Sequence, residues 1–198
     1  MHTIVPIIEG QGERQAVPLL LRRLLHDASV YDVRIDDPVN AHGVGNLSAK
    51  LERFLQHAHR RPGCSAIIVI QDGEGACPAE LVREHVWRAF EAGCARPVAF
   101  VIANRMYESW LVASSGTVMP DSEPFEGDPE VLHSPKVWLD HHMPPGLAYK
   151  ETTDQAAMTA RLDPALARKC RSFRRLEAAL SFLLDCVRTG QSGVDPQT

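Results

Sequence analysis

The sequence predicts an α/β protein with a parallel sheet of about four strands, flanked by helices and followed by a C-terminal loop and helix extension. Short apolar runs alternate with amphipathic stretches over the first half of the chain, which is typical of βαβ units. The run Ala66–Ile70 is apolar throughout, as in a strand buried on both faces. The length of 198 residues suits one domain with additions, since a domain typically takes about 100–200 residues.

The first two predicted strands enclose a predicted helix. Thr3–Ile8 is an apolar run, and Tyr31–Ile35 alternates apolar with charged residues, as a half-exposed strand does. Between them, Glu13–Leu25 places its apolar residues on one helical stripe: Ala16, Val17, Leu20, Leu21, Leu24 and Leu25. Two prolines fit less well, because Pro6 removes a ladder donor from the strand and Pro18 should kink or delay the helix.

The next elements complete the alternation. Helical spacing returns over Leu47–Arg60. After the strand at Ala66–Ile70, a helix is predicted to begin near Pro78, which suits a first turn, and to end before Gly93, which suits a C-terminal cap. Pro97–Ala103 supplies the fourth strand.

The rest of the chain predicts an extension. Pro120–Pro145 is rich in proline and acidic residues, which is typical of a loop. Helices are predicted over Thr153–Ala160 and Phe173–Val187, the second with Ser172 as N-cap and Gly190 as C-terminal stop.

The chain therefore divides into three expected parts. We expect an α/β core over residues 1–115, an extension packed on this core over residues 116–190, and a flexible tail over residues 191–198.

Composition favours an ordinary globular protein, with 44% apolar and 23% charged residues. The longest apolar runs are far shorter than the ~20 residues that a membrane-spanning helix needs, and the N-terminus lacks a signal-peptide pattern. We expect a cytoplasmic protein without a membrane partner. The five cysteines are odd in number and form no C-x-x-C pair, which favours free, buried thiols over zinc ligands or disulfides.

The formal net charge of −4 argues against a protein that coats nucleic acid through a general positive field. A phosphate-bearing substrate would need a local basic patch or a bound metal ion. The sequence contains candidates for both.

Acidic residues follow two predicted strands at the point where each strand ends. The first strand runs into Glu9-Gly10-Gln11-Gly12-Glu13, and the third runs into Asp72-Gly73-Glu74-Gly75. Ligands of open parallel sheets bind beyond the carboxyl ends of the strands, and the glycines allow a sharp turn there. We expect these carboxylates to converge. For Glu13, a role at the N-terminus of the following helix is an equal alternative.

Converging carboxylates predict a cation. Two like charges about 4 Å apart repel by roughly 4 kcal/mol at an effective dielectric constant of 20, so such a cluster needs a cation or a shared proton. Oxygen ligands without nearby Cys or His select Mg²⁺ or Mn²⁺, which favours phosphoryl-transfer chemistry. The expected metal ligands are Glu9, Asp72, Glu74 and Glu108, although structural capping is an equal alternative for Glu108. The expected catalytic residues are Glu9, Glu13 and Asp72, with Glu9 as ligand or general base.

These residues carry a resemblance to a known family. The segments are strand-Glu9-Gly-Gln-Gly-Glu13, Asp72-Gly-Glu74 after a strand, Glu108-Ser-Trp110-Leu, and a tail with Tyr149-Lys150, Thr153-Asp154-Gln155 and Cys170-Arg-Ser172-Phe173. The chain resembles Toprim-like proteins, and more narrowly the bacterial and archaeal domain-of-unknown-function family 4276, related to the Toprim domains of old-family nucleases.

The resemblance implies a compact Rossmann-like sheet whose acids bind magnesium and act on phosphodiesters, as in primases, topoisomerases and old-family nucleases. It also implies an ATPase partner, as in some bacterial defence systems. The family's second motif is Asp-x-Asp, whereas this chain has Asp72-x-Glu74, whose longer second carboxylate reaches a different metal position.

Phosphate-binding candidates lie in the C-terminal part. Lys150 and Arg171 are the residues expected to bind phosphate, and Arg171 belongs to the basic stretch Arg161–Arg175. The alternative for both is a solvated side chain on a helix face. Asp140-His141-His142 superficially matches a motif of another metallophosphoesterase class, but a locally hydrogen-bonded loop is the favoured interpretation.

Two functions follow. The leading hypothesis is a magnesium-dependent, phosphodiester-processing enzyme of the nuclease type, acting as the effector of an ATPase-linked defence system. The competing hypothesis is a non-catalytic interaction subunit that binds an ATPase or nucleic acid, which the Asp72-x-Glu74 variation and the negative net charge favour.

Overall fold

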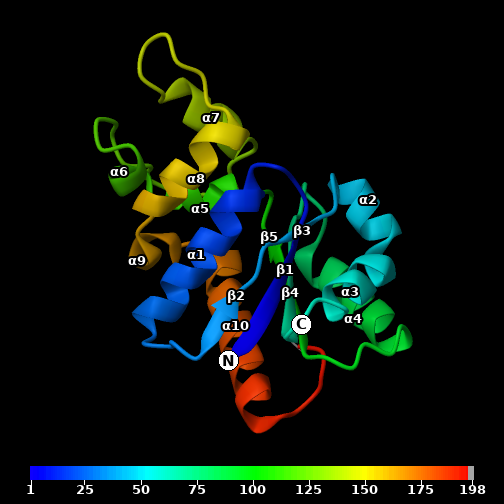
Figure 1. The fold of residues 1–198 in the computed structure, drawn as a ribbon. Coiled ribbons are helices and arrows are strands. Elements are labelled where there is room, and N and C mark those ends of the chain that lie inside the picture. The colour runs from blue at the N-terminus through cyan, green and yellow to red at the C-terminus, as the bar shows by residue number, and fades with distance from the viewer. Residues whose placement is uncertain (196–198) are drawn as a thin grey trace.

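A five-stranded parallel sheet forms the centre of the computed structural model, which describes residues 1–195 (Figure 1). Its strands are β1 (His2–Ile8), β2 (Val33–Ile35), β3 (Val39–Asn40), β4 (Cys64–Asp72) and β5 (Val98–Ala103). Their order is β2-β1-β4-β5, and β3 pairs with β1 beyond β2. The predicted fold class is confirmed. The additional strand β3 was missed because two residues are too few to show alternation.

Helices cover both faces of the sheet. The helices α1 (Glu13–Asp27) and α10 (Arg171–Thr189) pack on one face, and α3 (Leu51–His59) and α4 (Pro78–Glu91) pack on the other. In β1, Ile4 and Ile8 join the first of these two cores, while Val5 and Ile7 join the second. The period of two in the strand therefore supplies both hydrophobic layers.

Six further helices occur in residues 1–195. They are α2 (Val44–Ala49), α5 (Glu108–Ala113), α6 (Ser115–Val118), α7 (Pro135–His141), α8 (Glu151–Arg161) and α9 (Pro164–Ala167). Figure 1 shows α5 to α9 gathered beyond α1, with α8 packed along it. The predicted loop at Pro120–Pro145 is wrong over α7, whose first residue, Pro135, occupies a position where a missing N–H is tolerated. The single helix predicted over Leu47–Arg60 is divided at Lys50 into α2 and α3.

Pro6 lies in the middle of the central strand β1. The sheet tolerates it because strand pairing on one side of β1 is interrupted at this residue. Residues His2–Ile4 pair with β2, and Ile7 and Ile8 pair with β3, so no neighbour on that side faces Pro6. The Ile4 and Ile8 carbonyls accept bonds from that side, so the Pro6 nitrogen also faces it. Proline has no N–H to donate, but no strand lies opposite Pro6 on that side, so no hydrogen bond between strands is lost. The helix α1 begins at Glu13 as predicted and continues through Pro18.

The N-terminus of α10 is capped by a residue distant in sequence. The predicted N-cap, Ser172, is wrong, because the helix begins at Arg171, two residues before the predicted Phe173, and the Ser172 hydroxyl accepts a bond from Trp110 Nε1 at 2.7 Å. The carboxylate of Glu130 accepts bonds from the backbone nitrogens of Arg171 (2.9 Å) and Ser172 (2.8 Å) instead. At the other end Gly190 adopts the left-handed conformation, which confirms the predicted stop.

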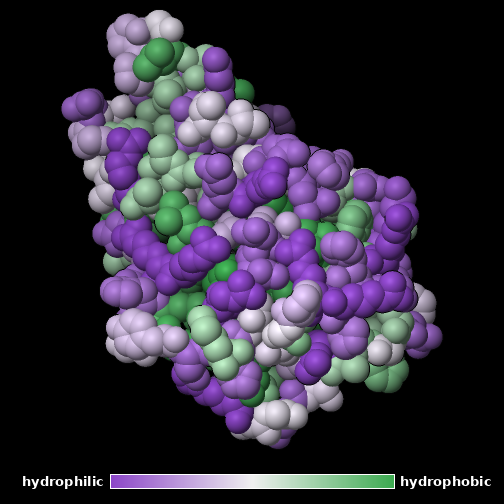
Figure 2. Space-filling view, viewed as in Figure 1, coloured by the Kyte–Doolittle hydropathy of each residue, from purple (hydrophilic) through white to green (hydrophobic). Residues whose placement is uncertain are grey.

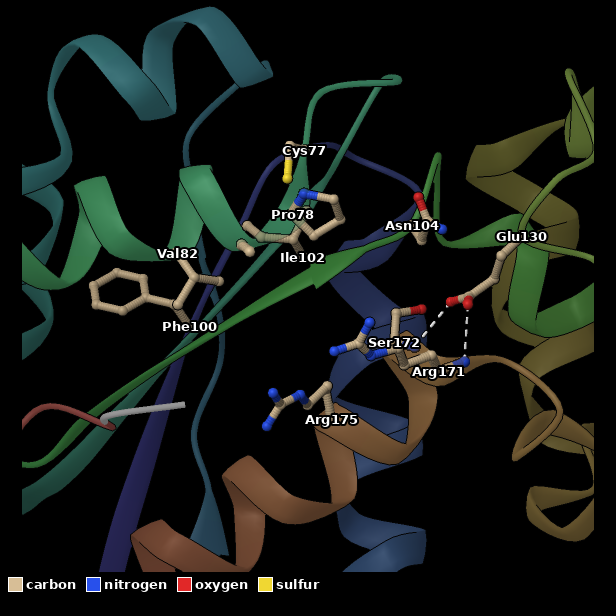
Figure 3. Close-up of a pocket in the computed structure, with 11 residues that line it drawn as sticks. Cys77, Pro78, Val82, Phe100, Ile102, Asn104, Glu130, Arg171, Ser172 and Arg175 are labelled. Atoms are coloured by element: carbon tan, nitrogen blue, oxygen red, sulfur yellow. Dashed lines mark hydrogen bonds between the residues drawn. The ribbon is translucent and has the colours of Figure 1, made fainter. Parts of the chain in front are cut away.

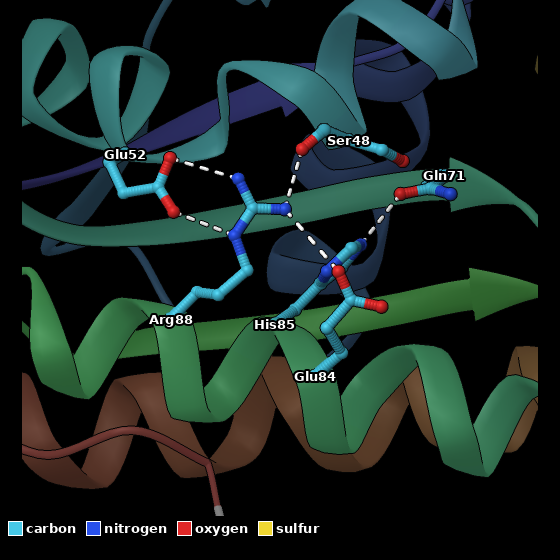
Figure 4. Close-up of polar contacts among 6 residues, drawn as sticks. All are labelled: Ser48, Glu52, Gln71, Glu84, His85 and Arg88. Atoms are coloured by element: carbon cyan, nitrogen blue, oxygen red, sulfur yellow. Dashed lines mark hydrogen bonds and ion pairs between the residues drawn. The ribbon is translucent and has the colours of Figure 1, made fainter.

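On the opposite face, an ion pair ties α4 to α3 (Figure 4). Arg88 Nε and Nη2 donate to the two carboxylate oxygens of Glu52 at 2.6 and 2.9 Å, and Nη1 donates to the Ser48 carbonyl. Beneath this pair, the buried His85 ring contacts Gln71 Oε1 at 2.9 Å. This arrangement fixes α4 beside the residue that precedes Asp72.

The end of the chain returns to the edge strand β5. Val98 N donates to the Gly193 carbonyl at 3.0 Å, and Asp195 N donates to the Val98 carbonyl at 2.8 Å. This part of the expected tail is thus hydrogen-bonded to the sheet, whereas residues 196–198 lie outside the described residues. The division into core, extension and tail stays a prediction.

The face of the molecule shown in Figure 2 is largely hydrophilic, with small, scattered hydrophobic areas. Among the helices of residues 1–195, none combines the length and the apolar character needed to cross a membrane.

Candidate functional site: an acidic cluster at the ends of β1 and β4

The loop after β1 is held by the side chain of Glu13. Its Oε2 accepts bonds from the backbone nitrogens of Glu9 (2.9 Å) and Gly10 (3.0 Å). Glu13 is the first residue of α1 and only 5% exposed, so its carboxyl group folds back from the helix over the loop. These bonds hold the loop that precedes α1 and do not cap the helix itself, and they place Glu13 beside Glu9.

Glu9 and Asp72 come together across the sheet, as the sequence predicts. Glu9 Oε2 accepts a bond from Asp72 N at 3.1 Å, which joins the ends of the neighbouring strands β1 and β4. Asp72 Oδ1 in turn accepts a bond from Tyr107 N at 2.8 Å. Hydrogen bonds therefore link the segments after β1, β4 and β5 around these two carboxylates.

Glu108 is the fourth acid of this cluster and is completely buried. Its Oε1 accepts bonds from Tyr149 Oη (2.9 Å) and from Gln155 Nε2 (3.2 Å). Its Oε2 is buried without a hydrogen-bond partner among the described residues, and so is Gln155 Oε1. A buried acceptor without a donor is costly, so it marks a position where a proton or a cation would stabilise the protein.

The electrostatic state of the cluster follows from burial and mutual repulsion. Burial raises the pKa of Glu13 to about 8, and the charges of Glu9 and Glu108 add to this effect. Burial also raises the pKa of Asp72, followed by repulsion from Glu13, Glu108 and Glu9. The pKa values of Glu9 and Glu108 are raised as well, in both cases mainly by burial. The four acids thus resist carrying full charge together without a cation.

Lys136 supplies positive charge beside these acids and was missed by the sequence analysis. It lies in the first turn of α7, and its Nζ is 2.6 Å from Glu151 Oε1. Burial lowers the pKa of Lys136, but the charges of Glu108, Glu151 and Asp72 outweigh burial, so the net pKa is raised. The one sequence feature that could have indicated a helix here is Pro135, since proline suits a first helical turn. The other prolines nearby made the segment look like a loop.

Three other predicted residues lie apart from the four acids. Glu74 is exposed in a turn with φ of +46°, although its charge contributes to the raised pKa of Glu9. Lys150 is exposed at the N-cap of α8, where its backbone nitrogen donates to Asp154 Oδ2. Arg171 is exposed at the start of α10 and lines a separate cavity.

The Asp140-His141-His142 segment makes local contacts. The His142 ring stacks on Trp138 with centroids 3.8 Å apart, and its Nδ1 contacts the Trp138 carbonyl. Asp140 Oδ1 accepts a bond from Tyr149 N at 2.8 Å. The local hydrogen bonds agree with the favoured interpretation, but the predicted loop is wrong, because Asp140 and His141 lie in the last turn of α7.

The donor set of the cluster suits a hard cation such as Mg²⁺. All four side chains offer carboxylate oxygens, and one oxygen of Glu108 is buried without a partner. Within residues 1–195, no three His, Cys, Asp or Glu side chains are arranged to hold a metal ion as they stand. Binding would therefore require rotation of the carboxylates toward one point.

Gly12 permits the close approach of α8 to this loop. A Cβ atom at this position would lie 2.6 Å from Gln155 Oε1, 2.9 Å from Glu151 Cβ and 3.2 Å from the Glu151 carbonyl oxygen. Glu151 pairs with Lys136, and Gln155 donates to Glu108. Gly12 thus lets α8 deliver both side chains to the cluster.

We expect Gly12→Ala to lower the free energy of unfolding by about 1–3 kcal/mol, because overpacking forces α8 to shift. Urea unfolding monitored by circular dichroism measures this change. Gly10→Ala is the matched control, since nothing lies within 4 Å of a Cβ there, and we expect a change within about 0.5 kcal/mol. Equal stability of the two variants would contradict the close packing described here.

A family model matches most of the chain, and a solved structure has a similar fold. No curated protein matches the chain. The C-terminal region of the Burkholderia pseudomallei OLD protein is similar in structure, with a TM-score of 0.43 and 12% identity over 94% of this chain and 99% of that chain. The family described as domain of unknown function DUF4276 matches residues 8–181, which contain all four acids of the cluster. The chain therefore belongs to the DUF4276 family, which confirms the predicted membership.

Proposed function

We propose that this protein is a magnesium-dependent enzyme that hydrolyses phosphodiester bonds in nucleic acid. The observation that carries the proposal is the hydrogen-bonded meeting of Glu9 and Asp72 at the carboxyl ends of neighbouring parallel strands, with Glu13 and Glu108 beside them. Ligands of open parallel sheets bind at this edge. Four carboxyl groups there attract a cation, and a cation there attracts a phosphate.

The side chains have distinct roles in this proposal. Glu9 and Asp72 would hold Mg²⁺ or Mn²⁺ through the oxygens not used for backbone contacts, with the unpartnered Oε2 of Glu108 as a further donor. Glu13 keeps the loop in place. The bound ion would polarise the phosphodiester and neutralise the charge that develops on it. Lys136, already among the acids, would contact the phosphate.

Metal titration tests the proposal directly. In calorimetry, Mg²⁺ and Mn²⁺ should bind the wild-type chain and bind Glu9→Gln at least about tenfold more weakly, because one negative ligand is lost. Cleavage of labelled DNA and RNA oligonucleotides should require the same ions and stop on chelation. The exposed Glu80→Gln on α4 is the control variant and should bind and cleave as the wild type does.

A non-catalytic role is the second candidate, and the conformation of Glu74 favours it. Glu74 is exposed in a left-handed turn, and within residues 1–195 its side chain makes no hydrogen bond to the four acids, so the second acid of Asp72-x-Glu74 is displaced from them. An interaction subunit that binds an ATPase or nucleic acid would show no Mg²⁺ binding in the same titration. The ATPase partnership and a role in bacterial defence remain predictions from the resemblance.

A further inference from the structure

A cavity of about 210 Å³ lies between the first turns of α4 and α10, and residues that follow β4 and β5 contribute to its lining (Figure 3). One wall is apolar and consists of Pro78, Ala79, Val82, Phe100 and Ile102. The other wall is polar and includes Asn104, Glu130, Arg171, Ser172 and Arg175. None of Glu9, Glu13, Asp72 and Glu108 lines this cavity, so it is a separate space.

The polar wall carries net positive charge. Arg171 and Arg175 are four residues apart on α10, which puts them on the same face of the helix. Glu130 contributes a negative charge, but both of its carboxylate oxygens accept bonds from the first backbone nitrogens of α10. Both Glu130 oxygens are therefore occupied by the backbone of α10, and Arg171 supplies positive charge for a ligand in the cavity.

The cavity and the acidic cluster share two loops. Cys77 lines the cavity and lies in the loop that follows Asp72. Asn104 also lines it and is three residues before Tyr107, whose backbone nitrogen donates to Asp72 Oδ1 at 2.8 Å, so the Cα atoms of Asn104 and Tyr107 are at most about 11 Å apart. A chain-like ligand can therefore occupy both places at once.

We propose that this cavity is a subsite for the nucleotide that neighbours the cleaved phosphodiester. The apolar wall suits the face of a base, the Asn104 amide suits its polar edge, and Arg171 suits the phosphate. A purely apolar ligand would leave the Arg171 guanidinium unused, and a small inorganic anion would leave the apolar wall unused. Typical small-molecule sites span about 300–1,000 Å³, so the smaller cavity suits one nucleotide unit. This inference rests on the proposed function and deepens it.

Oligonucleotide binding to the full chain tests the subsite. Fluorescence anisotropy with labelled single-stranded DNA and RNA is measured in an Asp72→Asn background, where cleavage does not interfere. Adding Arg171→Gln should weaken binding at least about tenfold, because a charge-assisted hydrogen bond is lost. It should also reduce the slope of log affinity against log salt by about 0.7, the value for one phosphate contact of a single strand. Adding Ala79→Trp, which fills the cavity at constant charge, should weaken binding to a similar degree.

The control is Arg60→Gln, which removes the same charge from an exposed position at the end of α3 that does not line the cavity, and it should leave affinity unchanged. Equal losses in Arg171→Gln and Arg60→Gln would indicate general charge attraction and overturn the subsite. Unchanged affinity in Arg171→Gln, with wild-type chain that cleaves, would overturn the subsite alone. Absence of both binding and cleavage in the wild-type chain would overturn the subsite together with the proposed function. Circular dichroism verifies that each variant is folded.

Discussion

Replacing Asp72 with Asn is expected to lower metal-dependent cleavage by at least about 100-fold. Losing a group that merely orients a metal ligand costs about 10–100-fold, and Asp72 is proposed as a ligand itself. The Asn carbonyl retains the size of the carboxylate and can accept the bond from Tyr107 N, so the fold should persist. Single-turnover cleavage of labelled oligonucleotides under saturating Mg²⁺ measures the effect.

Stability separates this loss from unfolding. Burial and the charges of Glu13, Glu108 and Glu9 raise the pKa of Asp72, so removing its charge should leave the metal-free protein equally stable or more stable at about pH 8. Asp121→Asn, in an exposed loop of the extension, is the matched control and should retain full activity. Undiminished cleavage by Asp72→Asn would show that this carboxylate does not carry the reaction.

Without divalent cations, the free energy of unfolding is expected to fall as pH rises from about 5 to about 8. Burial raises the pKa of Glu13 from 4.5 to about 8 in the folded protein. Between these values the folded chain holds a proton that the unfolded chain has released, so each rise in pH favours unfolding. The contribution of one such group is up to about 1.4 kcal/mol per pH unit. Urea unfolding in a chelator at several pH values measures it.

Glu13→Gln should flatten this pH dependence, because Gln fills the same space and cannot ionise. Glu80→Gln, at an exposed position of α4, should leave the slope unchanged. Added Mg²⁺ should restore stability near pH 8, since a ligand that binds only the folded state stabilises it. Stability that rises over this interval in the chelator would contradict a buried, protonated Glu13.

The closeness of Glu9 and Asp72 was predictable, because it depends on sequence patterns within single strands and on the geometry of parallel sheets. Apolar runs defined β1 and β4, and parallel strands present their carboxyl ends at one edge, so Glu9 and Asp72 had to be near each other if the strands were neighbours. Glycine-rich turns after each strand reinforced this expectation. Glu108 also joined the cluster, although a purely structural cap was an equal alternative.

The contributions of the extension were not predictable in the same way. Lys136 stands in a proline-rich segment that lacks helical periodicity, and it lies beside the acids because α7 packs on α5 and forms an ion pair with Glu151 of α8. Glu130 caps α10 across a long separation in sequence, which displaced the predicted Ser172 cap. Capping rules describe neighbours along the chain, whereas this bond joins residues that only the folded chain brings together.

The sequence by itself determined the α/β class, the strands that carry Glu9 and Asp72, and the oxygen-only character of the donors, because periodicity and residue chemistry are local properties. Only the tertiary structure decided that Glu74 is exposed, that Lys136 stands beside the acids, and that Arg171 faces a separate cavity. Those positions depend on how distant segments pack, and packing follows from the burial of the whole chain, which no single segment specifies.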